Sequence, residues 1–121
     1  MTIKLKPMNS AIKTKWINAL TSGQYLQGTG TLKDTIQGKL QFCCLGVLCD
    51  LYSKENGKPW TESGAILNES VVLPLEVMDW AGIERARTRE VNISTTISLV
   101  TLNDTKRYSF NDIAKQIQEH L

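Results

Sequence analysis

The segment from Phe42 to Tyr52 constrains the fold most, because its side chains are apolar almost all round once the segment is wound as a helix. A helix without a polar face must be covered on most sides, so we predict that this segment forms the centre of the core. Gly46 costs roughly 1 kcal/mol relative to alanine in a helix interior, and we therefore expect a neighbouring element to cross closely there. This longest apolar run is about ten residues, well short of the ~18 that a membrane span needs.

The spacing of apolar residues predicts three further helices, at about residues 10–21, 73–82 and 109–121. Residues that favour helix ends stand at the expected places in all three. They are Asn9 or Ser10 with Gly23 for the first helix, Pro74 with Gly82 for the second, and Ser109 with Asp112 for the third. We expect the apolar stripes of these helices to pack against the central segment.

Two regions favour β structure. Thr31–Leu32 and Leu40–Phe42 can pair as short antiparallel strands around the turn from Asp34 to Gly38. Residues 91–99 alternate apolar and polar side chains, which is typical of a strand, but Ser98 can instead cap a short helix that follows it.

These patterns predict an α+β fold. We expect one small globular domain over residues 1–121, mainly helical, with about four helices and a short antiparallel β element.

The composition is that of an ordinary globular domain. Of the 121 residues, 41% are hydrophobic and 21% are charged, far from the signature of a disordered chain. The formal net charge of +2 is too small to argue for nucleic-acid binding. The basic N-terminal segment lacks the apolar core and the cleavage site of a secretory signal, so we expect the chain in the cytoplasm.

Cys43, Cys44 and Cys49 are odd in number and crowded into an apolar segment, which indicates buried, reduced thiols rather than disulfides. A structural zinc site wants four ligands, and the single histidine, His120, stands at the extreme C-terminus. We therefore predict no metal and no cofactor. His120 is also poorly placed to act as the base of a thiol nucleophile.

Catalytic motifs give little support for an enzyme. The sequence contains no phosphate-binding loop, dinucleotide-binding fingerprint or nucleophile elbow. Paired-carboxylate chemistry stays open, although no spacing nominates a pair. The carboxylates that can converge are Asp34, Asp50, Asp79, Asp104 and Asp112.

Seven polar residues are candidates for a binding site, because they lie in turns or loops and are not needed for the apolar stripes. They are Tyr25, Gln27, Asn103, Asp104, Arg85, Arg87 and Arg89. Tyr25 would supply a stacking face and Gln27 and Asn103 would supply amide groups, while guanidinium groups suit phosphate or an acidic protein. The alternatives are a structural turn at Asn103-Asp104 and a solvated loop for the arginines.

Four phrases resemble a family of small, uncharacterised proteins encoded by tailed bacteriophages. They are "KWINALTSGQYLQGTGTL", "FCCLGVLCDLY", "LPLEVMDWAGI" and "LNDTKRYSFNDIAKQI", and they follow one another through most of the chain. The resemblance implies a phage source, and no reaction, cofactor or partner comes with it.

The resemblance and the missing catalytic set together favour a non-catalytic phage accessory protein that acts by binding in the host cytoplasm, in host takeover or counter-defence. Two mechanisms compete: inhibition of a host protein, and sequestration of a phosphate-bearing small molecule. The alternatives are a small enzyme acting on nucleotides and a weak nucleic-acid-binding module. We expect neither nucleic acid nor membrane as the partner, and the oligomeric state stays open.

Overall fold

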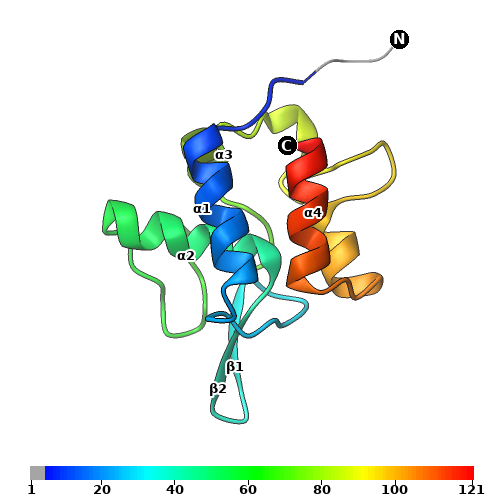
Figure 1. Cartoon of the computed structure of the whole chain (residues 1–121). Helices are drawn as coiled ribbons and strands as arrows, with labels where there is room; N and C mark the ends of the chain where they lie inside the picture. Colours follow the sequence, from blue (N-terminus) through cyan, green and yellow to red (C-terminus); the bar gives the residue numbers. More distant parts are fainter. Residues whose placement is uncertain (1–4) are drawn as a thin grey trace.

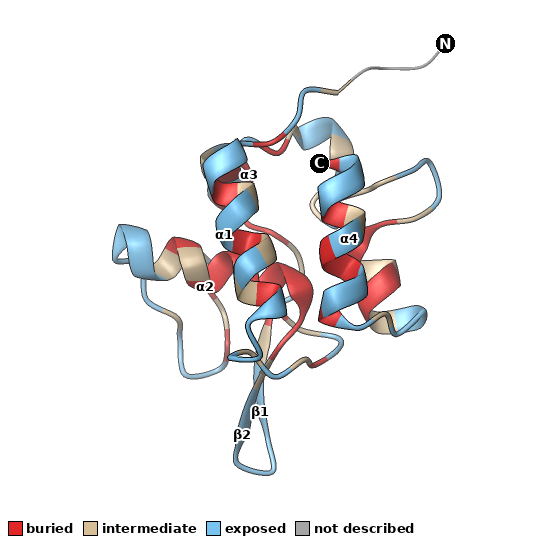
Figure 2. Cartoon of the chain, in the orientation of Figure 1, coloured by how far each residue is buried: buried red, intermediate tan, exposed pale blue. Residues whose placement is uncertain are grey.

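The predicted central segment forms helix α2 (Cys44–Asn56), and eight of its residues are buried. The computed structural model describes residues 5–121, so the first four residues of the basic N-terminal segment lie outside the described part. Figure 2 shows the burial concentrated in the first half of α2, where the other helices meet it. The helix continues past its predicted end at Tyr52 and stops at Gly57, whose φ of 65° is the left-handed conformation that glycine adopts readily.

Helices α1 (Ser10–Thr21) and α4 (Phe110–His120) lie side by side in opposite directions (Figure 1). Their predicted caps are both formed. Asn9 Oδ1 accepts the Ile12 N–H at 3.0 Å, and Ser109 Oγ accepts the Asp112 N–H at 3.1 Å. The apolar stripes of both helices are buried in one hydrophobic core with α2, as the spacing predicts. The buried stripe residues are Ile12, Trp16 and Leu20 in α1 and Phe110, Ile113, Ala114 and Ile117 in α4.

The close crossing predicted at Gly46 is confirmed. A Cβ atom added to Gly46 would lie 1.7 Å from the backbone oxygen of Leu32. The chain just before the first strand therefore passes directly over α2, and only glycine leaves enough room. Helix α3 (Leu75–Ala81) ends at Gly82, with a φ of 71°, as predicted, but it begins at Leu75, so Pro74 is the residue before the helix and not its first residue.

Strands β1 (Lys33–Ile36) and β2 (Lys39–Phe42) form an antiparallel hairpin that projects from the helices (Figure 1). Ile36 pairs with Lys39 across a two-residue turn at Gln37-Gly38, both of which have positive φ. The residues predicted for the first strand, Thr31 and Leu32, lie just before β1, and residues 34–36 of the predicted turn belong to the strand instead. Leu32 is buried and is hydrogen-bonded to Ser70 and Cys43.

The predicted strand at residues 91–99 is wrong. The structure has one isolated bridge there, between Asn92 and Ser98, with a tight loop between them. Ser98 Oγ instead accepts the Thr101 N–H at 3.1 Å, so the alternative of a Ser98-capped helical turn is confirmed. The turn widens into a short π-helix, η2 (Thr101–Thr105). The alternation of apolar residues resembles that of a strand, but it has another cause. Val91 and Leu99 are buried at the two ends of a loop, where the Leu99 N–H donates to the Val91 carbonyl.

The fold is thus a small single α+β domain, as predicted, with a two-stranded antiparallel hairpin. A short 3₁₀-helix, η1 (Arg85–Arg87), connects α3 to the loop at residue 91. Among the helices of the described part, none has the length and apolar character to cross a bilayer.

Candidate functional site

Asn103, in η2, is the centre of a buried hydrogen-bond network. Its side chain is 1% exposed. Nδ2 donates to the carbonyl of Gly28 at 2.9 Å and to Asp104 Oδ1 at 2.8 Å. Oδ1 accepts from Gln27 Nε2 at 2.9 Å and from the backbone N–H of Cys44 at 3.2 Å. An amide has two donors and two acceptor positions, so Asn103 has no hydrogen-bonding capacity left for a ligand.

The network joins segments that are far apart in the sequence. Gln27 Nε2 also donates to the carbonyl of Tyr108, just before α4, at 2.8 Å. Cys44 begins α2, where backbone N–H groups have no partner within the helix, so Asn103 caps α2 from a distant segment. Trp16 Nε1 in α1 donates to the carbonyl of Cys44 at 3.0 Å. The Asn103 network therefore has a structural role, because it holds the start of α2 against η2 and the segment before α4.

Tyr25 belongs to a second cluster, centred on Asp50 in α2. The Tyr25 hydroxyl donates to Asp50 Oδ2 at 2.6 Å and Trp60 Nε1 donates to Oδ1 at 3.0 Å. Lys54 Nζ lies 3.1 Å from Oδ2. The ring of Phe42 packs edge-to-face against both aromatic neighbours, with centroids 5.0 Å from Tyr25 and 6.2 Å from Trp60. The cluster fixes the loops carrying Tyr25 and Trp60 to the middle of α2.

The Asp50 cluster is not poised for proton transfer at neutral pH. Burial alone would raise the pKa of Asp50, but hydrogen bonds from Tyr25, Lys54 and Trp60 outweigh it and hold that pKa below its usual value. Burial, followed by the bond to Asp50, raises the pKa of Tyr25. The bond to Asp50 raises the pKa of Lys54. All three values move away from neutrality, the opposite of what general acid–base catalysis needs.

Arg87 lies at the far end of α4 from the Asn103 network. Its Nη2 donates to the carbonyl of His120 and its Nη1 donates to that of Asn92, both at 2.9 Å. Gln27 contacts the residues just before α4, and an eleven-residue helix is about 16 Å long. The structure therefore does not bring Arg87 to the Gln27–Asn103 site.

The other two arginines are also engaged with nearby residues. Arg85 forms a bidentate pair with Asp79, at 2.7 Å and 3.3 Å, on the exposed surface. Arg89 Nε donates to the carbonyl of Leu73 at 3.0 Å, and its guanidinium pairs with Glu69. Arg89 is half-buried, so part of the expected solvated loop is tied to the segment before α3.

The three cysteines are buried and free of disulfides, and their predicted burial is confirmed. Burial raises the pKa of the Cys43 thiol to about 11 and those of Cys44 and Cys49 well above the usual range. This environment disfavours the thiolate, which is the reactive form. Within residues 5–121, no group of three His, Cys, Asp or Glu side chains is arranged to hold a metal ion.

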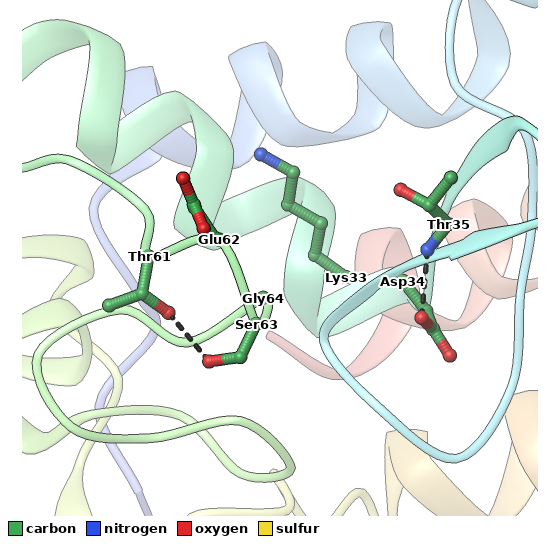
Figure 3. A pocket seen from close by; sticks show the side chains of 7 residues that line it. All are labelled: Lys33, Asp34, Thr35, Thr61, Glu62, Ser63 and Gly64. Atoms are coloured by element: carbon green, nitrogen blue, oxygen red, sulfur yellow. Dashed lines mark hydrogen bonds between the residues drawn. The ribbon is translucent and has the colours of Figure 1, made fainter.

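An open hollow of about 430 Å³ lies beside the hairpin, between β1 and the turn from Thr61 to Gly64 (Figure 3). Its other lining residues are Lys33, Asp34 and Thr35 from β1 and Glu62 and Ser63 from the turn. Lys33 Nζ lies 4.9 Å from the centroid of the Trp60 ring, so the hollow adjoins the Asp50 cluster. Sequence reasoning missed this hollow because nothing in the local sequence says that residues 61–64 return to the edge of β1.

Most of the chain, residues 8–121, matches a known family described as "Domain of unknown function (DUF8296)". The chain belongs to this DUF8296 family. No curated protein matches the sequence. Likewise, no solved structure matches it. The family description assigns no reaction, so function has to be argued from the geometry.

Proposed function

We propose that this DUF8296 chain acts without catalysis, by binding a protein partner through the β1–β2 hairpin. The observation that carries the proposal is the exposed apolar surface of that element. Ile36 is 45% exposed, Leu40 is 46% exposed, and Leu26, whose carbonyl bonds β2 at Phe42, is 48% exposed. Leu40 pairs with Thr35 and Ile36 pairs with Lys39, so the two side chains lie on opposite faces of the hairpin, and each face exposes one large apolar residue. Exposed apolar side chains on a projecting element are typical of protein–protein contacts.

The hairpin contributes little to the core beyond its base. Phe42 is buried in the core, but Ile36 and Leu40 are not, and Figure 2 shows the outer part of both strands exposed. The residues proposed from sequence as binding groups are, by contrast, engaged in structural hydrogen bonds. A surface that packing does not require is free to serve a partner.

The source of the partner is proposed from the sequence phrases that resemble tailed-phage proteins. We place the binding in the bacterial host cytoplasm, as an accessory function in host takeover or counter-defence. Inhibition of a host protein needs an accessible contact surface, which the projecting hairpin provides. The polar groups of the Asn103 network and the Asp50 cluster are instead hydrogen-bonded within the protein.

Sequestration of a phosphate-bearing small molecule is the second candidate, and the hollow beside β1 is what favours it. Lys33 and the hydroxyls of Thr35, Thr61 and Ser63 line that hollow and can bind phosphate oxygens. The carboxylates of Asp34 and Glu62 line the same hollow and repel an anion. The protein partner is therefore the stronger proposal.

The test is purification of the tagged chain from an expressing bacterium, followed by native mass spectrometry. We expect one host protein in near-equal amount with the wild-type chain, and its loss with the double variant I36S/L40S. The matched control is V71S/L75S, which changes two apolar residues that are 49% and 39% exposed elsewhere. This control should keep the partner.

The same measurement separates the alternatives. A small molecule released intact in stoichiometric amount, with no protein present, would support sequestration. Altered nucleotide product in excess of the chain would indicate an enzyme. Equal loss of the host protein with both double variants would contradict a role specific to the hairpin.

A further inference from the structure

The outer edge of β1 is an unpaired strand edge beside the hollow. Within the described residues the sheet has only two strands, and β1 pairs with β2 alone. The other edge of β2 is partly covered, because Phe42 N–H donates to the carbonyl of Leu26 at 2.9 Å and Phe42 C=O accepts the Gly28 N–H at 2.8 Å. The edge that borders the hollow belongs to β1.

The register shows which backbone groups face the hollow. Both peptide groups of Phe42 point away from β1, and Lys33 stands directly opposite Phe42. In an antiparallel pair, the groups of Lys33 therefore also point outward, and those of Thr35 do so two residues later. The Thr35 N–H is bonded at 2.8 Å by the side chain of Asp34. A carboxylate thus occupies a backbone donor that a neighbouring strand would otherwise take.

The facing wall is set by Gly64. Its φ is 87°, and an added Cβ would lie 2.3 Å from the backbone oxygen of Lys33. The turn therefore closes against β1 at the base of the hairpin and stands apart from it farther out, where Thr61, Glu62 and Ser63 line the hollow (Figure 3). The result is a groove that runs beside the strand edge and is open to solvent.

The polar groups of the groove favour a cationic, donor-rich occupant. Asp34 on one wall and Glu62 on the other are carboxylates. The only cation among the lining residues is Lys33, and its ammonium lies against aromatic faces, 4.9 Å from the Trp60 centroid and 5.8 Å from that of Phe42. The lining therefore has two negatively charged side chains and one positively charged side chain, which favours a cationic occupant.

We propose that this groove binds an extended, basic segment of the partner protein, which adds to β1 as a third strand. Backbone hydrogen bonds to the Lys33 N–H and the Thr35 C=O would fix the segment, as in other complexes formed by strand addition, since Gly64 covers the Lys33 carbonyl and Asp34 bonds the Thr35 N–H. Lysine or arginine side chains of the segment would pair with Asp34 and Glu62 on the two walls. This inference deepens the proposed function, because it names the contact that a protein partner makes beside the apolar hairpin.

The probe is a short synthetic peptide of alternating lysine and valine, labelled for fluorescence anisotropy and blocked at both ends. We expect it to bind, and to weaken about tenfold when D34N/E62Q removes both charges, since exposed charge pairs contribute modestly. Asparagine at 34 keeps an oxygen that can accept the Thr35 N–H. The control variant E76Q/E119Q removes two exposed carboxylates outside the groove and should leave the affinity unchanged.

Two further peptides test strand addition itself. A glutamate–valine peptide should not bind, and a lysine peptide with proline in place of valine should bind much more weakly because it lacks backbone donors. Amide chemical-shift changes on binding should centre on residues 33–35 and 61–64. Equal binding of the proline peptide, equal weakening by both double variants, or shifts centred elsewhere would overturn the groove proposal.

These outcomes are distinct from those of the proposed function. Loss of the host protein with I36S/L40S but no binding of the lysine–valine peptide would refute the groove and leave the hairpin's role standing. Peptide binding at the groove without any co-purifying protein would refute the proposed function and leave only a peptide-binding groove.

Discussion

The two ends of the hairpin differ sharply in how their side chains are used. At its base, Leu32 passes over Gly46 of α2 with no spare room, and nearby Asn103 has all of its amide hydrogen bonds satisfied inside the protein. Toward its tip, Ile36 and Leu40 are nearly half exposed and pack little against the core. The fold therefore depends on the base and leaves the tip available for a partner.

This difference teaches that a polar residue in a turn is a poor guide to a binding site in so small a domain. Asn103 and Gln27 are polar because they replace missing backbone partners at the start of α2 and before α4. An exposed isoleucine on a short strand carries no sequence signal, yet it is the residue that packing does not explain. Substitutions at the two ends should separate stability from binding.

The largest effect is expected for G46A, at the base. The added methyl would meet the backbone oxygen of Leu32, and relieving the clash requires a shift of the backbone of α2 or of the Leu32 segment. We therefore expect a loss of at least ~2 kcal/mol in the free energy of unfolding. Urea unfolding followed by tryptophan fluorescence measures it. G28A is the comparison, because its nearest neighbours are atoms of the partly exposed Gln41 side chain, and its loss should be smaller. A smaller loss for G46A than for G28A would refute the tight crossing.

N103A should have the next largest effect, because it leaves Cys44 N–H, the Gln27 amide and Gly28 C=O without their present partner. An unsatisfied buried group costs about 1–3 kcal/mol, so we expect a loss of roughly 2 kcal/mol or more in the free energy of unfolding. The exposed substitution N111A is the control and should change stability little. If N103A instead retained full stability and lost partner binding, Asn103 would be a binding residue, and the interpretation of its hydrogen-bond network as structural would be wrong.

Asp50 gives a smaller, pH-dependent effect. Its pKa is lowered in the folded protein by the bonds from Tyr25, Lys54 and Trp60, which together outweigh burial. Its stabilisation is therefore present above the unfolded pKa of about 3.9 and is lost as pH falls through the lower folded value. D50N should cost about 1 kcal/mol at neutral pH and less below the folded pKa.

Urea unfolding across the acid range measures this dependence. The stability difference between wild type and D50N should shrink as pH falls from about 4 through the lower folded pKa of Asp50, below which both side chains are neutral. D112N, which removes an exposed carboxylate in α4, is the matched control for loss of a carboxylate outside the Asp50 cluster. A difference for D50N that grows on acidification would contradict the lowered pKa.

Sequence spacing was a good guide to the helices and to the Gly46 crossing, because periodic apolar stripes, caps and glycines act locally. It failed at residues 91–99, where alternation came from burial of Val91 and Leu99 in a loop rather than from a ladder. It grouped Gln27, Asn103 and Asp104 correctly in space. It offered a structural turn at Asn103-Asp104 as the alternative to a binding site, but it did not foresee the hydrogen-bond network, the Asp50 cluster or the groove, since each depends on contacts between segments distant in the sequence.

The smallest effect on stability is expected for I36S/L40S at the tip. Both side chains are nearly half exposed, and surface substitutions of this kind usually change the free energy of unfolding by less than ~0.5 kcal/mol each. The same variant is expected to lose the co-purifying host protein, so binding and stability should move independently. Thermal unfolding measures the first quantity and native mass spectrometry the second. If I36S/L40S instead lost as much stability as N103A, the tip would belong to the structural core, and the contrast between the two ends of the hairpin would not hold.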